Sequence, residues 1–275
     1  MSAAQDDRKK VLTTLDTTAL LYGALVGLAL GLTGIGSVFA VPVLVYGLRL
    51  GPHAAVCISM AGIAATALVI SLRKSRIELI EVRVGGAVAA GGALGAPVGV
   101  WVNKQLSPNL LLVLFAVLAA VIGLWTLFTG TASESDGAES LSPPQTRHQN
   151  VFAQLTLMTL VGLIAGILSG MVGVGGGFFI IPALLFFGGL QIHSAIATSL
   201  PVVVLISAVA MTGHLVAGQR PSVGLTALFA AGGVVGVELG SRLGRRLDRA
   251  KLQRVFGVAV LVIAMLIGLR NLYGI

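Results

Sequence analysis

The chain has 275 residues, of which 56% are hydrophobic and only 10% carry a charged side chain. Soluble domains carry about 25% charged residues, so this composition excludes an ordinary water-soluble globular protein. The formal net charge of +8 could indicate nucleic acid as a partner. The basic residues cluster between apolar runs, however, which is the pattern that orients a chain in a lipid bilayer, and we expect no nucleic-acid partner.

Continuous apolar runs of about 20 residues recur along the chain, and each can cross a hydrocarbon core about 30 Å thick. Since the runs do not alternate with polar residues, they predict an all-α polytopic protein of the cell membrane. After a polar tail at 1–16, the long runs of the first half and its short run lie at 17–34, 37–48 (short), 53–72, 84–102 and 109–128. Those of the second half lie at 151–172, 177–188 (short), 193–217, 222–241 and 255–272. Residues 129–150 are rich in Ser, Pro and Gly and predict a flexible cytoplasmic linker.

The two halves, 17–128 and 151–275, are copies of one unit. GLTGIGSVFAVPVL (31–44) aligns with GMVGVGGGFFIIPAL (170–184), PHAAVCIS (52–59) with IHSAIATS (192–199), and GGALGAPVG (91–99) with GGVVGVELG (232–240). Glycines spaced four apart recur in both halves and are typical of helices that pack with their backbones close together. Such glycine-rich faces would also allow a homodimer without requiring one.

Basic residues predict that the repeats are inverted. They crowd between the third and fourth runs of the first half, at Arg73, Lys74, Arg76 and Arg83, and between the fourth and fifth runs of the second half, from Arg242 to Arg254. If both loops are cytoplasmic, equivalent loops face opposite sides of the membrane. If the chain is followed through the membrane from these loops, both termini lie outside. In each half, the first long run and the short run then form a helical hairpin that enters and leaves the membrane on the same side.

Each short run has about 12 residues, or about 18 Å, which cannot cross the bilayer unaided. Both follow a glycine-rich break and read as half-helices that turn inside the membrane. The amide N–H groups at a helix start carry partial positive charge and bind anions, and glycine removes the side chains that would block the approach. The predicted substrate-binding residues at and near the breaks are Gly34, Gly36, Ser37, Ser59, Gly173, Gly175, Gly176, Gly177, Thr198 and Ser199. For each hydroxyl residue, a bond to its own helix backbone is an equally open alternative.

The charged residues inside the membrane runs limit the chemical classes of ligand that the protein can bind. Glu238 is the one acidic residue within a membrane run, and it stands four residues before Arg242, which predicts a local ion pair. A metal-cation carrier would need buried carboxylates, so the pattern favours a small anion or a neutral solute. His53 and His193 begin equivalent helices, and each is either an interfacial packing residue or a proton-coupling residue. We expect no metal site, cofactor or catalytic residues, because no Walker motif, Cys/His cluster or nucleophile–base pair occurs.

The chain resembles the TauE/SafE family of sulfite and organosulfonate exporters. The resemblance lies in GILSGMVGVGGGFFIIPALL (166–185), HSAIATSLPVVV (193–204) and GGVVGVELGSRLGRRLDRAKLQRVFG (232–257), and in a weaker form in the first half. It implies a transporter of sulfite, sulfonates or related sulfur or carboxylate anions, with the glycine-rich segments at its core. The first half departs from the pattern at Ser37 and at residues 57–59, which leaves open whether both halves contact the substrate equally.

Together these features predict a secondary transporter or exporter of a small anion that works by alternating access. Two alternatives stay open. A passive anion channel could use the same core. In a non-transporting scaffold or an intramembrane enzyme, the breaks would pack against neighbouring helices without a water-lined cavity.

Overall fold

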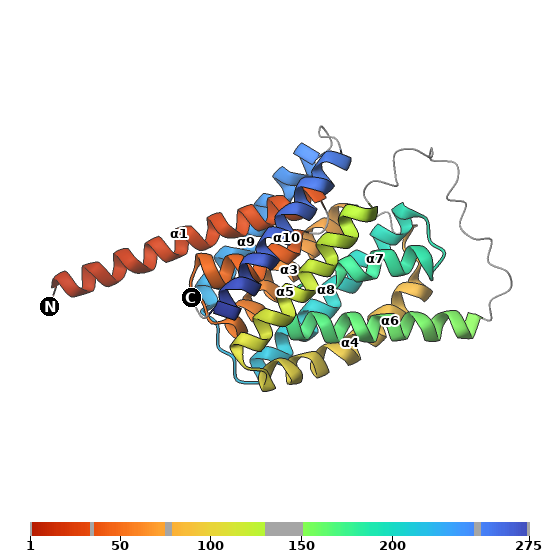
Figure 1. Ribbon diagram of the computed structural model, residues 1–275, viewed down its shortest axis with the longest axis horizontal. Helices are drawn as coiled ribbons and strands as arrows, with labels where there is room; N and C mark the ends of the chain where they lie inside the picture. Colours follow the sequence, from red (N-terminus) through yellow and green to blue (C-terminus); the bar gives the residue numbers. More distant parts are fainter. Residues whose placement is uncertain (1, 34–35, 75–78, 130–150, 245–248, 274–275) are drawn as a thin grey trace.

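The computed structural model describes residues 2–33, 36–74, 79–129, 151–244 and 249–273 (Figure 1). Gly34 lies outside these residues. The elements of the first half are α1 (Ser2–Thr33), η1 (Gly36–Phe39), α2 (Ala40–Pro42), η2 (Val43–Gly47), α3 (Pro52–Lys74), α4 (Val82–Gln105) and α5 (Pro108–Thr129). Those of the second half are α6 (Val151–Val172), α7 (Gly177–Phe186), α8 (Ile192–Val216), α9 (Val223–Gly244) and α10 (Arg249–Tyr273).

Within these ranges the structure contains helices and no strands, which confirms the all-α prediction. Five helices are long and apolar enough to cross a membrane: α3, α4, α6, α8 and α9. Helix α1 begins at Ser2 rather than near residue 17, so the polar residues 2–16 continue the first helix, and Figure 1 shows this end projecting beyond the bundle. The described apolar parts of α1, α5 and α10 are shorter than the five spans.

The two short segments differ in form. Helix α7 is a regular α-helix of 10 residues that contains Pro182. Its counterpart in the first half passes from a 3-10 turn through three α-helical residues into a π-helical turn. Pro42 is the last α-helical residue of this segment.

The halves pack against each other through equivalent pairs of helices. The most extensive contacts are those of α1 with α9 and of α4 with α6. Since α1 corresponds to α6 and α9 to α4, these are one interface formed twice. The pair α5 and α10 and the pair α3 and α8 likewise join equivalent helices.

The spaced glycines form these interfaces. A β-carbon on Gly27 would overlap the carbonyl of Gly233 on α9, and one on Gly95 would overlap the carbonyl of Leu163 on α6. Alanine at these positions would therefore force the backbones apart. The packing interpretation of the glycine ladders is confirmed, and their partners belong to the opposite half.

The order of these contacts gives the directions of the helices. Helices α1 and α9 run in the same direction, as do α4 and α6, α3 and α9, and α4 and α8. Helices α5 and α10 run in opposite directions, which Figure 1 also shows. The contacts that establish these directions are Gly23–Phe229 with Gly31–Val237, Gly91–Thr159 with Gly99–Ile167, Gly62–Phe229 with Gly233–Thr66, Gly85–Thr198 with Gly92–Ile206, and Gly123–Leu261 with Gly257–Leu127.

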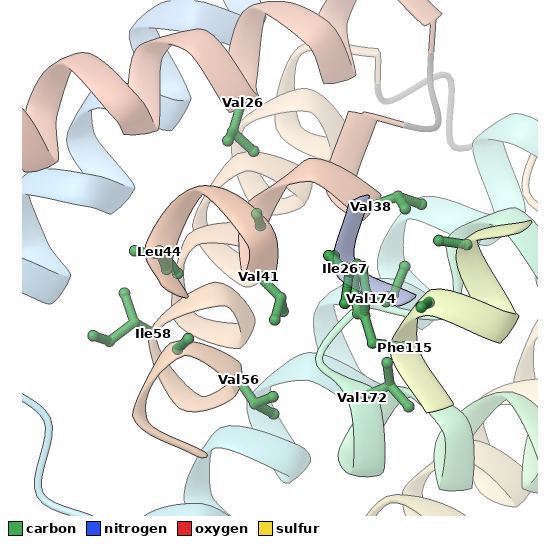
Figure 2. Packing of buried hydrophobic residues seen from close by; sticks show 14 of the residues in the cluster. Val26, Val38, Val41, Leu44, Val56, Ile58, Phe115, Val172, Val174 and Ile267 are labelled. Atoms are coloured by element: carbon green, nitrogen blue, oxygen red, sulfur yellow. The ribbon is translucent and has the colours of Figure 1, made fainter. Parts of the chain in front are cut away.

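One buried apolar cluster brings the two breaks together. Val38, just after the first break, and Val174, inside the second, belong to the same cluster, with Phe115 of α5 and Ile267 of α10 (Figure 2). Both valines are 2% exposed or less. Because these side chains exclude lipid and water, they hold non-helical backbone inside the bundle, where a membrane protein can tolerate it.

Candidate anion site at the helix breaks

The second break is a tight turn that only glycine forms without strain. Gly173, Gly175 and Gly176 have φ angles of 82°, 78° and 67°. L-residues with side chains rarely adopt this left-handed region. The turn carries the chain from the end of α6 at Val172 to the start of α7 at Gly177. This geometry explains three of the four predicted glycines.

The second break lies at the middle depth of the bundle. Gly175 lies against Ile63, which is near the midpoint of α3, and Gly177 lies against Val203, which is near the midpoint of α8. Gly176 faces Ala165 on α6. This break therefore lies deep between helices of both halves.

Four carbonyl groups before and within the second break have donors outside the regular helix ladder. Gly173 N–H donates to Ser169 O (2.8 Å), and the hydroxyl of Ser59 donates to Gly173 O (2.8 Å). Two side chains reach the last turn of α6. Asn103 Nδ2 donates to Met171 O (2.6 Å), and His214 Nε2 donates to Gly170 O (2.9 Å).

The amide groups at the start of α7, in contrast, have no side-chain cap. Gly176 precedes the helix in a left-handed conformation, and no side chain caps it. The N–H groups of Phe179 and Ile180 turn inward to Gly176 O, at 3.0 and 3.1 Å. The first N–H groups of a helix have no acceptor within the helix. The described bonds thus use the carbonyls of Gly170, Met171, Gly173 and Gly176 as acceptors, and they leave donors at Gly177 and in the turn before it.

The first break is only partly described, because Gly34 is outside the described residues. Gly36 begins η1 and lies so close to Ala29 and Leu30 that a β-carbon would overlap their backbone. Ser37 is 6% exposed and lines a cavity of about 10 Å³ with Ile63 and Thr66, roughly the space of one water molecule. Ile63 lines this cavity and also touches Gly175, so it stands between the two breaks.

The repeats differ at this cavity. Ala40, Gly62 and Thr66 are among the small or polar residues that line it. The spacing of the repeat matches them with the buried residues Ile180, Val202 and Ile206 in the second half. Larger side chains therefore fill the equivalent positions, and the two breaks do not have the same surroundings.

Of the predicted hydroxyl residues, Ser59 reaches a break. It is fully buried, and it bonds both to Gly173 O and to Val56 O of its own helix (2.8 Å each). Ser199 donates to Ile196 O in its own helix (3.0 Å), which is the alternative considered for these residues. The hydroxyl of Thr198 accepts the N–H of Glu81 (3.1 Å) and so faces the start of α4.

Polar residues outside the predicted substrate-binding set lie beside the second break. His53 Nδ1 lies 2.9 Å from Asn103 Oδ1, and Gln219 Nε2 approaches the same oxygen at 3.5 Å. Asn103 and His214 are both fully buried. The signal that could have found them is a polar side chain in or at the end of an apolar run, which is rare without a partner. The side chain of His193 lies outside the described part of the structure.

The predicted local ion pair is present. Arg242 lies 2.7 Å from Glu238 Oε1, and the pair sits at the C-terminal end of α9, where Gly240 packs against Leu28 and Gly31 of α1. This carboxylate is therefore occupied by a neighbour one turn away, as the spacing predicted.

Comparisons with known proteins support the resemblance. A family model described as Sulfite exporter TauE/SafE matches residues 19–267. A probable membrane transporter protein of Xylella fastidiosa (strain 9a5c) is 32% identical over 249 residues, which cover 88% of this chain and 91% of that protein. The probable membrane transporter protein YunE of Bacillus subtilis (strain 168) is 22% identical over 273 residues, covering 96% and 97%.

No solved structure gives a significant match. The family match spans both repeats and both breaks, and the relatives align over nearly their whole length. With its apolar helices, the chain is a multi-pass membrane protein that belongs to the sulfite exporter TauE/SafE family of membrane transporters.

Proposed function

We propose that the protein is a secondary transporter of a small anion, of the class of sulfite, organosulfonates or related sulfur and carboxylate anions. One observation carries this proposal: the carbonyls of Gly170, Met171 and Gly173 have side-chain donors, while the first amides of α7 have no cap. A cation bound here would compete with these donors for the same carbonyls. An anion needs donors, and the helix start adds its partial positive charge.

We assign the contacts with the anion to the predicted residues in two groups. The amides of Gly34, Gly36, Ser37, Gly175, Gly176 and Gly177 bind the charged group. Gly173, whose own N–H bonds to Ser169 O, shapes the turn, and the hydroxyl residues Ser59, Thr198 and Ser199 surround the site. Ser59 acts by fixing the carbonyl of Gly173. Its bond turns the donors of the peptide chain, rather than this acceptor, toward the ligand.

We infer that the repeats are inverted and that substrate moves by alternating access. The directions of the helices support this: α5 and α10, which are equivalent, run opposite to each other, and α3 runs with α9 rather than with its equivalent α8. The ends of α3 and α9 carry the two basic loops, so one face of the bundle has both. Positive charge favours the cytoplasmic side. With both basic loops in the cytoplasm, the linker is also cytoplasmic and both termini lie outside the cell.

Two further predictions belong to this proposal. His53 or His193 could couple transport to protons, and a homodimer could form through exposed apolar faces in the bilayer. Under this proposal the protein is a carrier and not an enzyme, in keeping with the relatives that are named membrane transporters.

The proposal is tested by flux in proteoliposomes. We expect purified protein to move sulfite, sulfoacetate or taurine faster than protein-free vesicles, with saturation at high concentration. Unlabelled anion on the far side should accelerate the exchange. Currents from single open channels would favour the passive channel, and an absence of flux for every anion would contradict the transporter.

A further inference from the structure

His214 is a buried histidine with one nitrogen unused. It lies in the last turn of α8 and is fully buried. Its Nε2 lies 2.9 Å from Gly170 O, and since a carbonyl can only accept, this nitrogen carries the proton. In the neutral ring Nδ1 is then an acceptor, and it has no partner among the described residues.

The position of His214 joins it to the second break. Gly170 is in the last turn of α6, one turn before Gly173. His214 also lies at the C-terminal end of its own helix, so it sits where two helices end. Helix C-termini carry partial negative charge and favour a cation. A proton on Nδ1 would therefore be held by two helix ends and would add a positive charge beside the anion site.

A second acceptor without a donor lies next to His214. Gln219 Oε1 is buried and has no partner among the described residues, and Gln219 N–H bonds to His214 O (3.1 Å). The break thus has unused donors on one side and unused acceptors on the other. An anion matches the first set, and a proton matches the second.

The other titratable groups around His214 are few. His53 on α3, held by Asn103, is the titratable neighbour that interacts with it. Helices α6 and α7 contain no ionisable residue. Lys104 on α4 is exposed, as is Arg220 after α8. Within the described residues, no carboxylate therefore lies ready to balance a charge on His214.

We propose that His214 binds one transported proton at Nδ1 and that the proton and the anion bind cooperatively. A buried charge is costly unless it is paired, and the anion is the charge that pairs with it. By linkage each ligand then raises the affinity for the other by the same factor. The imidazole takes one proton from water, keeps its bond to Gly170, and releases the proton when the anion leaves. This inference rests on the proposed function and assigns the coupling to a residue other than His53 or His193.

The test uses the full-length wild-type protein in detergent and sulfoacetate, whose charge does not change between pH 6 and pH 8. Calorimetry in two buffers of different ionisation enthalpy measures the protons taken up on binding. We expect uptake approaching one proton, and affinity that rises by up to about tenfold for each pH unit lowered. Binding without proton uptake would overturn this inference alone, whereas an absence of binding for every anion would contradict the proposed function.

Two matched variants locate the proton. In His214→Gln the amide can still donate to Gly170 O, so we expect binding to persist while proton uptake is lost. His53→Gln can still donate to Asn103, and we expect its proton uptake to match the wild type. Uptake that survives in H214Q, or that is lost in H53Q, would overturn the assignment. If H214Q does not fold, binding to the wild type without proton uptake, or loss of uptake in H53Q, would still overturn the assignment.

Discussion

At the scale of single residues, Asn103 joins three parts of the site. Its amide donates to Met171 O, and its carbonyl oxygen accepts from His53 and from Gln219. Since the Asn103 side chain is fully buried, Asn103→Leu would leave donors and acceptors unpaired. We expect a loss of stability of about 1–3 kcal/mol for each unpaired group, measured as a lower midpoint of thermal unfolding in detergent.

Gln105→Leu is the control for Asn103, since Gln105 is exposed at the end of the same helix. Surface changes of this kind alter stability by about 0.5 kcal/mol or less. An N103L protein that unfolds at the same temperature as Q105L would show that the network does not hold the end of α6.

At the scale of elements, the glycine ladder between α4 and α6 sets how closely the halves approach. Gly95→Ala would place a β-carbon against the carbonyl of Leu163, which is backbone and cannot rotate away. We expect G95A to lower the yield and the unfolding temperature of the protein. Gly86→Ala, on the same helix, meets nothing within 4 Å. There alanine should be neutral or stabilising, because it favours helix by about 0.5–1 kcal/mol. Equal stability of the two variants would mean that close approach is not required.

At the scale of the whole molecule, we expect both basic loops on the cytoplasmic side of the membrane. Cys57 is fully buried, so single cysteines can be introduced at exposed positions without removing it. We expect Glu81→Cys and Arg242→Cys to be protected from an impermeant maleimide added to intact cells, and Ser107→Cys and Ser222→Cys to react. Labelling that puts Glu81→Cys and Arg242→Cys on opposite sides would contradict the inverted arrangement.

The sequence predicted well those features that depend on local pattern. Long apolar runs gave the helices, because a bilayer demands a continuous apolar stretch. The repeated glycines located the breaks, since Gly173, Gly175 and Gly176 adopt a conformation that other residues avoid. The pair Glu238–Arg242 followed from helical spacing alone.

Features that depend on the rotation and pairing of helices could not be predicted in the same way. A glycine ladder indicates that another helix approaches closely but does not identify that helix. The sequence therefore did not predict that α1 packs on α9 and α6 on α4, each in the opposite half. Thr198 faces the start of α4 because of how α8 is rotated. The partners of His214 and Asn103 are main-chain carbonyls, which every residue has and which no sequence pattern distinguishes.

The central claim is that the uncapped amides at the start of α7 bind the anion. At Gly177 this claim can be tested by removing a single amide hydrogen. Gly177→Pro removes the amide hydrogen at the first position of the helix, where proline is well tolerated. Gly177→Ala keeps the hydrogen and adds the same β-carbon, which meets only the side chain of Val203. The measurement is the dissociation constant of the transported anion for both variants. A hydrogen bond to a charged group contributes about 1.5–3 kcal/mol, so the account predicts binding about 10- to 100-fold weaker in G177P than in G177A. Equal affinities in two folded variants would contradict it.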